Sequence, residues 1–154
     1  MSRVLALCAG ICLLATRPVP MTAQEANYDE NALRVDQRRG TLSIVRGVSG
    51  TPVLEVGAFR ATDVAGIVRP SPSAVAEAKI FERDYLPGAW SVSLGIATLG
   101  AAIGTSRIAN LNQVVPAGLA IAGMSLIVYG GRRLESAYRA LSKSIWWYNR
   151  DLKG

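Results

Sequence analysis

The chain contains no histidine, and its only two cysteines, Cys8 and Cys12, lie in the first apolar stretch. Aromatic residues make up only 6% of its 154 residues, and no Gly-rich Walker loop occurs. Outside that stretch, the chain therefore lacks the residues needed for a Cys-His nucleophile, a zinc site or histidine acid–base catalysis. We expect no enzyme, no metal, no cofactor and no small-molecule substrate.

Carboxylates could still form a catalytic pair, since Asp63, Glu77, Glu82 and Asp84 lie close together in sequence. Helix-surface charge explains these four residues better. Glu82 and Asp84 are also two positions apart, so they do not share a helix face.

Half of the residues are hydrophobic, and most of them fall in three uncharged stretches: Val4 to Thr16, Ala89 to Ser106 and Val114 to Gly131. The second and third each give about 27 Å of helix, close to the roughly 30 Å of a bilayer core. The short connection between them makes the helices antiparallel neighbours. We therefore predict a transmembrane hairpin over 89–131, with spans 89–106 and 114–131. The lack of charge within the spans argues against a proton relay, an intramembrane protease or a transporter acting alone.

The first stretch follows Met-Ser-Arg and rises only about 20 Å as a helix, too little to cross a bilayer. Its basic start, short apolar centre and small residue at Ala23 are typical of a secretory signal. We interpret residues 1–23 as a signal peptide. A permanent anchor and lipidation at a cysteine are less favoured alternatives.

Residues 24–88 are predicted to form a small polar α+β cap. Gln24 to Asp29 are expected to be a flexible lead-in. Alternating, β-branched segments then predict a meander of two or three strands, over residues 33–35, 41–45 and 53–57.

Two helices are predicted after the strands. The first is a short helix within Ala61 to Arg69. For the second, Ser71 is a suitable N-cap and Pro72 a suitable first residue. This helix is expected to run to about Tyr85 and to be broken by Leu86-Pro87-Gly88 before the membrane.

Small residues recur in both spans at spacings that let helix backbones approach closely in lipid. The candidate helix-packing residues are Gly95, Gly100, Gly104, Gly118 and Ala122. Packing of the two helices within one hairpin is the preferred explanation, and a glycine-lined homo-oligomer is the alternative.

Residues 132–154 are predicted to be an amphipathic tail helix, with direct continuation of the second span as one option. Apolar residues alternate by four and three from Leu134 to Leu152, which is a heptad pattern. Trp146 and Trp147 lie outside that seam. The tail could lie on the lipid surface, or pack on the 72–85 helix or on a second copy. The candidate interfacial or partner-contact residues are Arg132, Arg133, Tyr138, Trp146, Trp147 and Tyr148.

The net charge is +6, a mild surplus that suits anionic headgroups and comes without any nucleic-acid-binding motif. Basic residues are more frequent at the open ends of the hairpin than in its turn, which would place those ends in the cytoplasm. An exported signal would place them outside. We give the signal more weight, and expect the inner membrane with cap and tail on the extracytoplasmic side.

Several segments resemble a widespread group of uncharacterised small bacterial membrane proteins. They are Val56-Gly57-Ala58-Phe59-Arg60-Ala61-Thr62-Asp63-Val64, Ser-Pro-Ser-Ala-Val at 71–75, the glycine-rich hairpin, and Ser144-Ile145-Trp146-Trp147-Tyr148-Asn149. The resemblance spans roughly Leu42 to Asn149 and implies an architecture without an activity.

The expected fold is a mainly α membrane protein: a two-helix hairpin with a small α+β cap and an amphipathic C-terminal helix. The expected function is non-catalytic interaction or scaffolding in the bacterial cell envelope, with the lipid bilayer and a protein partner or another copy as partners. The alternatives are a glycine-packed oligomeric pore or membrane-perturbing assembly, and a silent accessory subunit of an envelope enzyme or transport complex.

Overall fold

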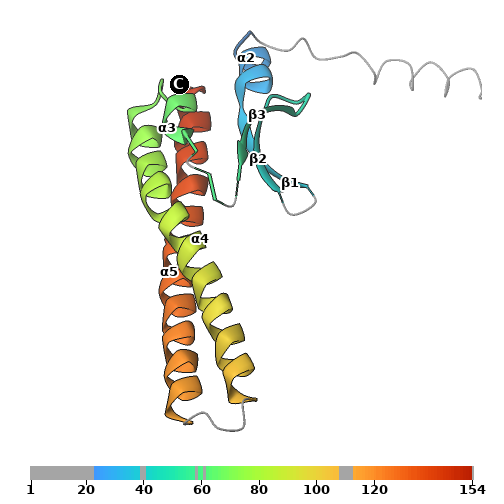
Figure 1. Ribbon diagram of the computed structural model, residues 1–154. Coiled ribbons are helices and arrows are strands. Elements are labelled where there is room, and N and C mark those ends of the chain that lie inside the picture. The colour runs from blue at the N-terminus through green and yellow to red at the C-terminus, as the bar shows by residue number, and fades with distance from the viewer. Residues whose placement is uncertain (1–22, 39–40, 58, 61, 108–112, 154) are drawn as a thin grey trace, which may run out of the picture.

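The computed structural model describes residues 23–38, 41–57, 59–60, 62–107 and 113–153. Two long antiparallel helices lie side by side, and a small sheet with one short helix packs beside the end of the pair remote from the hairpin turn (Figure 1). The elements are α2 (Ala23–Asn31), β1 (Leu33–Arg38), β2 (Thr41–Arg46), β3 (Thr51–Val56), α3 (Val64–Ile67), α4 (Pro72–Ser106) and α5 (Val114–Asp151). The predicted signal segment and most of the hairpin turn lie outside the described residues.

The three strands form the predicted antiparallel meander, in the order β1-β2-β3. Leu33 is opposite Arg46 in the first pair, and Leu42 is opposite Val56 in the second. Leu33, Ile44 and Val56 are buried, and they join the core that the sheet shares with α3, α4 and α5. The alternation that predicted the strands therefore also identifies the face that covers the helices.

The expectation of a flexible lead-in over 24–29 is wrong, because α2 covers these residues. No apolar stripe marks the helix in the sequence, but its end contacts the turn after β2. The amides of Gly47 and Val48 donate to the carbonyls of Ala32 and Asp29, each at 2.9 Å. Gly47 has φ 69° and leaves no room for a Cβ, which would lie 2.7 Å from the Glu30 carbonyl oxygen. A contact between segments distant in sequence thus stabilises a helix that its own sequence predicts only weakly.

The start of α4 is as predicted. Ser71 Oγ accepts from the Ala74 amide at 3.2 Å, and Pro72 is the first helical residue. Ser71 Oγ also donates to Asp151 Oδ2 at 2.6 Å. One hydroxyl thus caps α4 and joins it to the end of α5.

The predicted break at Leu86-Pro87-Gly88 is wrong, because α4 continues through Pro87 to Ser106. A proline inside a helix removes one hydrogen bond and costs about 3 kcal/mol or more. Residues on both sides of it, including Phe81 and Gly95, are buried in the same arrangement of two helices. Their packing against α5 offsets the local cost and keeps α4 continuous.

The tail is the direct continuation of the second span in α5. Of the three alternatives, it packs on the first turns of α4 within the same chain. Ala137, Leu141 and Ser144 are buried there, and Ser144 Oγ donates to the Ala74 carbonyl at 2.9 Å.

The other half of the helix pair has a different surface. Each helix contains an apolar stretch long enough to cross a membrane, and only 17% of that stretch in α4 and 11% in α5 is buried in the chain. Core helices of a water-soluble protein would bury such residues. The fold is therefore mostly helical, with two long apolar helices and a small three-stranded sheet, and the described residues leave its apolar half uncovered.

Candidate functional site

The two long helices meet along a seam of small residues. A Cβ on Gly95 would lie 2.7 Å from the Gly123 carbonyl oxygen, and a Cβ on Gly123 would lie 2.9 Å from that of Gly95. A Cβ on Gly130 would likewise lie 2.7 Å from the Gly88 carbonyl oxygen. The close-contact glycines are seven residues apart in each helix, so their backbones touch at two successive levels.

Of the predicted helix-packing residues, only Gly95 lies in this seam. Gly100, Gly104 and Gly118 have nothing within 4 Å of an added Cβ, and Ala122 is exposed. These four residues do not contact the other helix of the hairpin, because the contacting face of each helix is centred on the glycines of the seven-residue repeat. Gly88, Gly123 and Gly130 are not among the five selected residues, although that repeat is visible in the sequence.

Gly100 and Gly104 instead share an outward face of α4, four residues apart and open. This pattern is typical of helix contacts in lipid. The open face of Gly100 and Gly104 is therefore a surface through which the chain could self-associate, which was the alternative explanation of the glycines.

An ion cluster around one buried carboxylate lies where the core meets the apolar half of the hairpin. Asp84 of α4 is 6% exposed. It accepts from Arg83 at 3.0 and 3.2 Å, from Ser136 Oγ at 3.1 Å and from Arg133 at 3.5 Å. The interpretation of Asp84 as a helix-surface charge is wrong, because both α5 partners enclose it.

Electrostatics keep Asp84 ionised. The hydrogen bond from Arg83 lowers the pKa of Asp84 and outweighs burial, which raises it; Ser136 and Arg133 lower it further. The charged carboxylate thus connects α4 to α5 one turn before Pro87, as a structural link.

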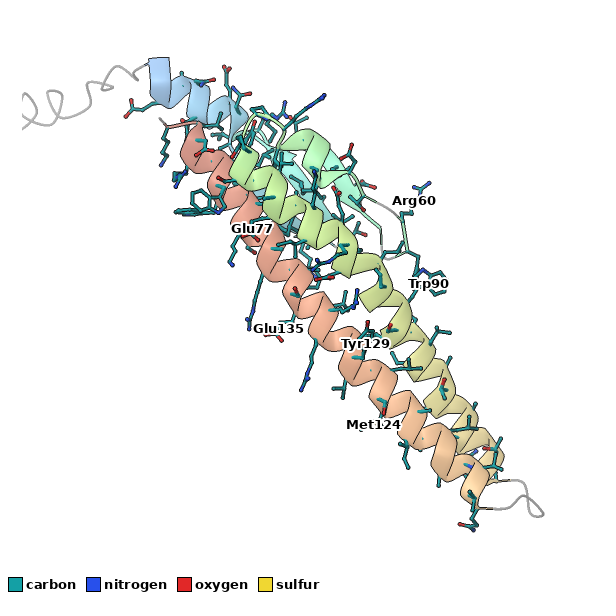
Figure 2. The ribbon with its side chains drawn as sticks, turned by 90° about the vertical axis from the view of Figure 1, so that its left-hand side faces the viewer. Arg60, Glu77, Trp90, Met124, Tyr129 and Glu135 are labelled. Carbon is teal, nitrogen blue, oxygen red and sulfur yellow. The ribbon has the colours of Figure 1, made fainter. Side chains whose placement is uncertain are left out.

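Beyond this cluster, aromatic and basic side chains surround the helix pair at one level. The position of Gly88 against Arg133 and Leu134, and of Val92 against Gly130, places Trp90 at the level of residues 130–132 of α5. Trp90 is 50% and Tyr129 51% exposed, and Figure 2 shows them on α4 and α5. We call Trp90, Tyr129, Arg132 and Arg133 the band. Its composition is typical of a membrane–water interface.

The loop after β3 reaches this band. The Phe59 and Trp90 rings have centroids 4.9 Å apart, and Figure 2 shows Arg60 and Trp90 along the same side of the molecule. The loop after β3 therefore contacts α4 at the level where the apolar half of the helices begins.

The predicted tail contacts divide into exposed and enclosed residues. Trp146 is 58% and Tyr138 42% exposed, but Tyr148 is 7% exposed and packs inside the core. The expectation of Tyr148 as a partner contact is therefore wrong, because the chain itself covers it. Arg150 lies 3.9 Å above the Trp147 ring and 5.5 Å from that of Trp146. Because α5 continues without a bend, Trp146 lies about 20 Å beyond Arg132 along the axis, which does not suit a tail folded onto the bilayer.

Asn149, which no prediction identified, attaches the sheet to the tail. Its Oδ1 accepts from the Leu33 amide and its Nδ2 donates to the Leu33 carbonyl, both at 2.8 Å. A side-chain amide thus takes the place of a neighbouring strand at the edge of β1. Tyr148 and Asn149 therefore both make their contacts within the chain itself.

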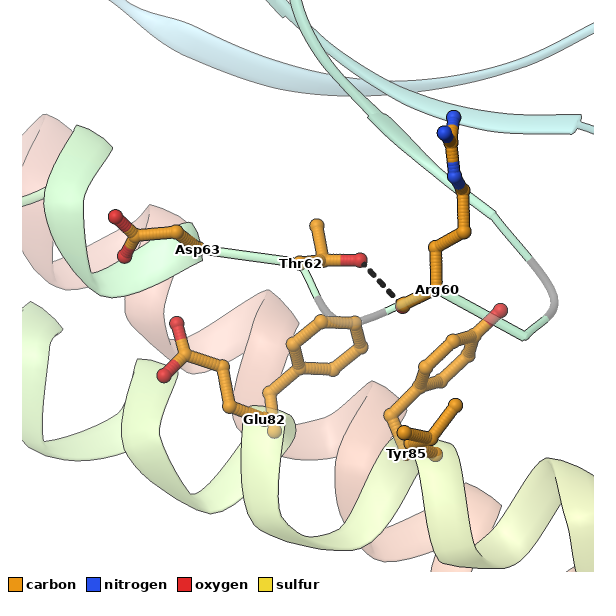
Figure 3. A pocket seen from close by; sticks show the side chains of 7 residues that line it. Arg60, Thr62, Asp63, Glu82 and Tyr85 are labelled. Atoms are coloured by element: carbon orange, nitrogen blue, oxygen red, sulfur yellow. Dashed lines mark hydrogen bonds between the residues drawn. The ribbon is translucent and has the colours of Figure 1, made fainter.

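A pocket of about 340 Å³ lies under the loop after β3, between Phe81, Tyr85 and Leu86 on one side and Arg60 and Thr62 on the other (Figure 3). Its two carboxylates are occupied. Asp63 Oδ1 accepts from the Gly66 amide at 2.7 Å, and Glu82 Oε1 accepts from the Ala65 amide at 2.8 Å. Both cap α3, so the pocket offers no free acid–base pair.

Among the described residues, no group of three or more His, Cys, Asp or Glu side chains could hold a metal ion. Comparison of the chain with protein-family models, curated proteins and solved structures finds no match. The geometry alone supports the proposals below.

Proposed function

We propose that this chain is a non-catalytic interaction or scaffold protein embedded in the membrane of the bacterial cell envelope. The observation behind the proposal is the division of α4 and α5 into two halves. One half buries a core with the sheet, while the other exposes large apolar side chains such as Ile121 and Ile96, at 69% and 60%. An apolar surface of this extent requires a lipid or protein environment.

The dimensions support a bilayer as that environment. At 1.5 Å per residue, α4 is about 52 Å long, so roughly 20 Å remain outside a hydrocarbon core of about 30 Å. The band lies where this division falls. We propose the inner membrane, with cap and tail on the extracytoplasmic side as the signal-like start predicts.

The proposal is tested by labelling single cysteines in intact cells with an impermeant thiol reagent, after Cys8 and Cys12 are changed to Ser. We expect Thr51→Cys and Ser142→Cys to react, and a cysteine at position 110 to react only after permeabilisation. Ile121→Cys is the matched control, because Ile121 is exposed in the chain but should be covered by lipid.

Two results would contradict the proposal in different ways. Labelling at Ile121 in membranes would show that no bilayer covers the apolar half. Labelling in intact cells at position 110 alone would reverse the orientation and place cap and tail in the cytoplasm.

A second candidate function is an oligomeric pore or membrane-perturbing assembly. The open face of Gly100 and Gly104 favours it, because another helix could approach there without steric conflict. Gly100→Leu and Gly104→Leu should then abolish a detergent-resistant oligomer, whereas Ala122→Leu on α5 should not. A monomeric wild type would eliminate this candidate.

A further inference from the structure

The outer face of α5 contains a shallow groove on the side turned away from α4. Its volume is about 420 Å³, and it is lined by Met124, Ser125, Val128, Tyr129 and Arg132. Met124, Val128 and Arg132 follow one another at four-residue spacing and form one row along the helix. Met124 and Val128 are 57% and 54% exposed. The groove is therefore apolar for two turns and ends at a cation.

The two arginines at that end differ in their contacts. Arg133 lies 5.2 Å from the Tyr129 ring centroid and 3.5 Å from Asp84 Oδ1. Arg132 is exposed and has no ion-pair or ring partner within the described residues. The nearest acid along α5, Glu135, accepts a hydrogen bond from Arg139. Arg132 therefore offers its five donors to a ligand.

We propose that this groove binds one phospholipid with a negatively charged headgroup. An acyl chain lies along Met124 and Val128, and a phosphate oxygen pair accepts from the Arg132 guanidinium. The inference rests on the proposed membrane location, and adds a lipid class and a site to it. Charge complementarity selects the occupant: the guanidinium binds phosphate in a bidentate manner and balances the charge of a headgroup that has no cation of its own, and an acyl chain matches the apolar row. The apolar spans of a second copy, 89–106 and 114–131, contain no acid that could pair with Arg132.

The test uses the full-length protein in detergent with a mixture of phosphatidylglycerol and phosphatidylcholine, and native mass spectrometry to count the lipids retained. Wild type should retain phosphatidylglycerol preferentially, and Arg132→Gln should lower that preference about fivefold, the usual effect of one basic residue at a charged membrane surface. Lys143→Gln is the matched control. It removes one positive charge from the same face of α5, about 16 Å farther from the groove, leaves the Glu135–Arg139 pair intact, and should leave the preference unchanged.

Retention by Arg132→Gln at the wild-type level, or an equal loss in Lys143→Gln, would overturn the site. Cross-linking of Met124→Cys to itself with exclusion of lipid would also overturn it in favour of a second copy. Co-flotation with neutral phosphatidylcholine vesicles separates the two proposals. A chain that floats without preferring phosphatidylglycerol refutes only the lipid site, whereas a chain that does not float refutes the membrane location.

Discussion

Replacement of Asn149 by Ala should weaken the attachment of the sheet to the helix pair. The side chain makes two hydrogen bonds of 2.8 Å to the main chain of Leu33, and Leu33 is 0% exposed. Each hydrogen bond contributes about 1 kcal/mol, and a buried main-chain group left without a partner costs about 1–3 kcal/mol. Because water can reach part of the vacated space, we expect a total loss of about 2–4 kcal/mol.

This loss can be measured at one amide by hydrogen exchange and mass spectrometry in detergent. At 1.4 kcal/mol per tenfold, the opening equilibrium of the Leu33 amide should rise about 30-fold to 1,000-fold. Asn149→Asp keeps the acceptor but places a second carboxylate oxygen against the Leu33 carbonyl oxygen, so it should not restore wild-type exchange. The control is Asn27→Ala, which removes an exposed hydrogen bond from Asn31 at 2.8 Å and should change stability by no more than about 0.5 kcal/mol. Unchanged exchange at Leu33 in Asn149→Ala would refute the idea that this amide docks the sheet.

Three further predictions concern the helix pair and its junction with the cap. Gly95→Ala should lower thermal stability in detergent by about 1–3 kcal/mol through overpacking, whereas Gly100→Ala should have no such cost; equal effects would contradict the assigned seam. Asp84 has a lowered pKa when folded. Its contribution to the stability of the fold is therefore present above its unfolded pKa of about 3.9 and is lost as pH falls through the folded pKa. Asp84→Asn should therefore lower stability at pH 7 and weaken its acid dependence, and parallel wild-type and mutant pH profiles would contradict this role. Glu82→Ala should cost about 1 kcal/mol in denaturant unfolding by uncapping α3, while Glu82→Gln, which keeps an acceptor for the Ala65 amide, should cost less; equal losses would contradict the capping role.

Much of the fold follows from local physics that is legible along the chain. The alternation in residues 33–35, 41–45 and 53–57 predicts the strands, since one side of each must face a core. Ser71 and Pro72 predict the start of α4 because an N-cap and a first-turn proline act within a few residues. The apolar composition of 89–106 and 114–131 likewise predicts two long helices.

The candidate site was less predictable, because it depends on how each helix is rotated about its axis. Several rows of small residues run along α4, and sequence spacing alone does not show which row meets α5. The Gly100–Gly104 row matched a familiar motif, yet the seven-residue repeat through Gly88 and Gly95 forms the contact. The position of this glycine contact fixes the rotation of both helices, and that rotation places Gly100, Gly104 and Arg132 on the outer faces.

By itself, the sequence determined the strands, the cap of α4 and the two uncharged apolar stretches, each a consequence of side chains within a few residues of one another. The tertiary structure alone decided that α4 continues through Pro87, that residues 24–29 are helical, and that Asp84 is enclosed. In each of these cases the deciding contact comes from a residue distant in sequence, and its free energy outweighs the local preference.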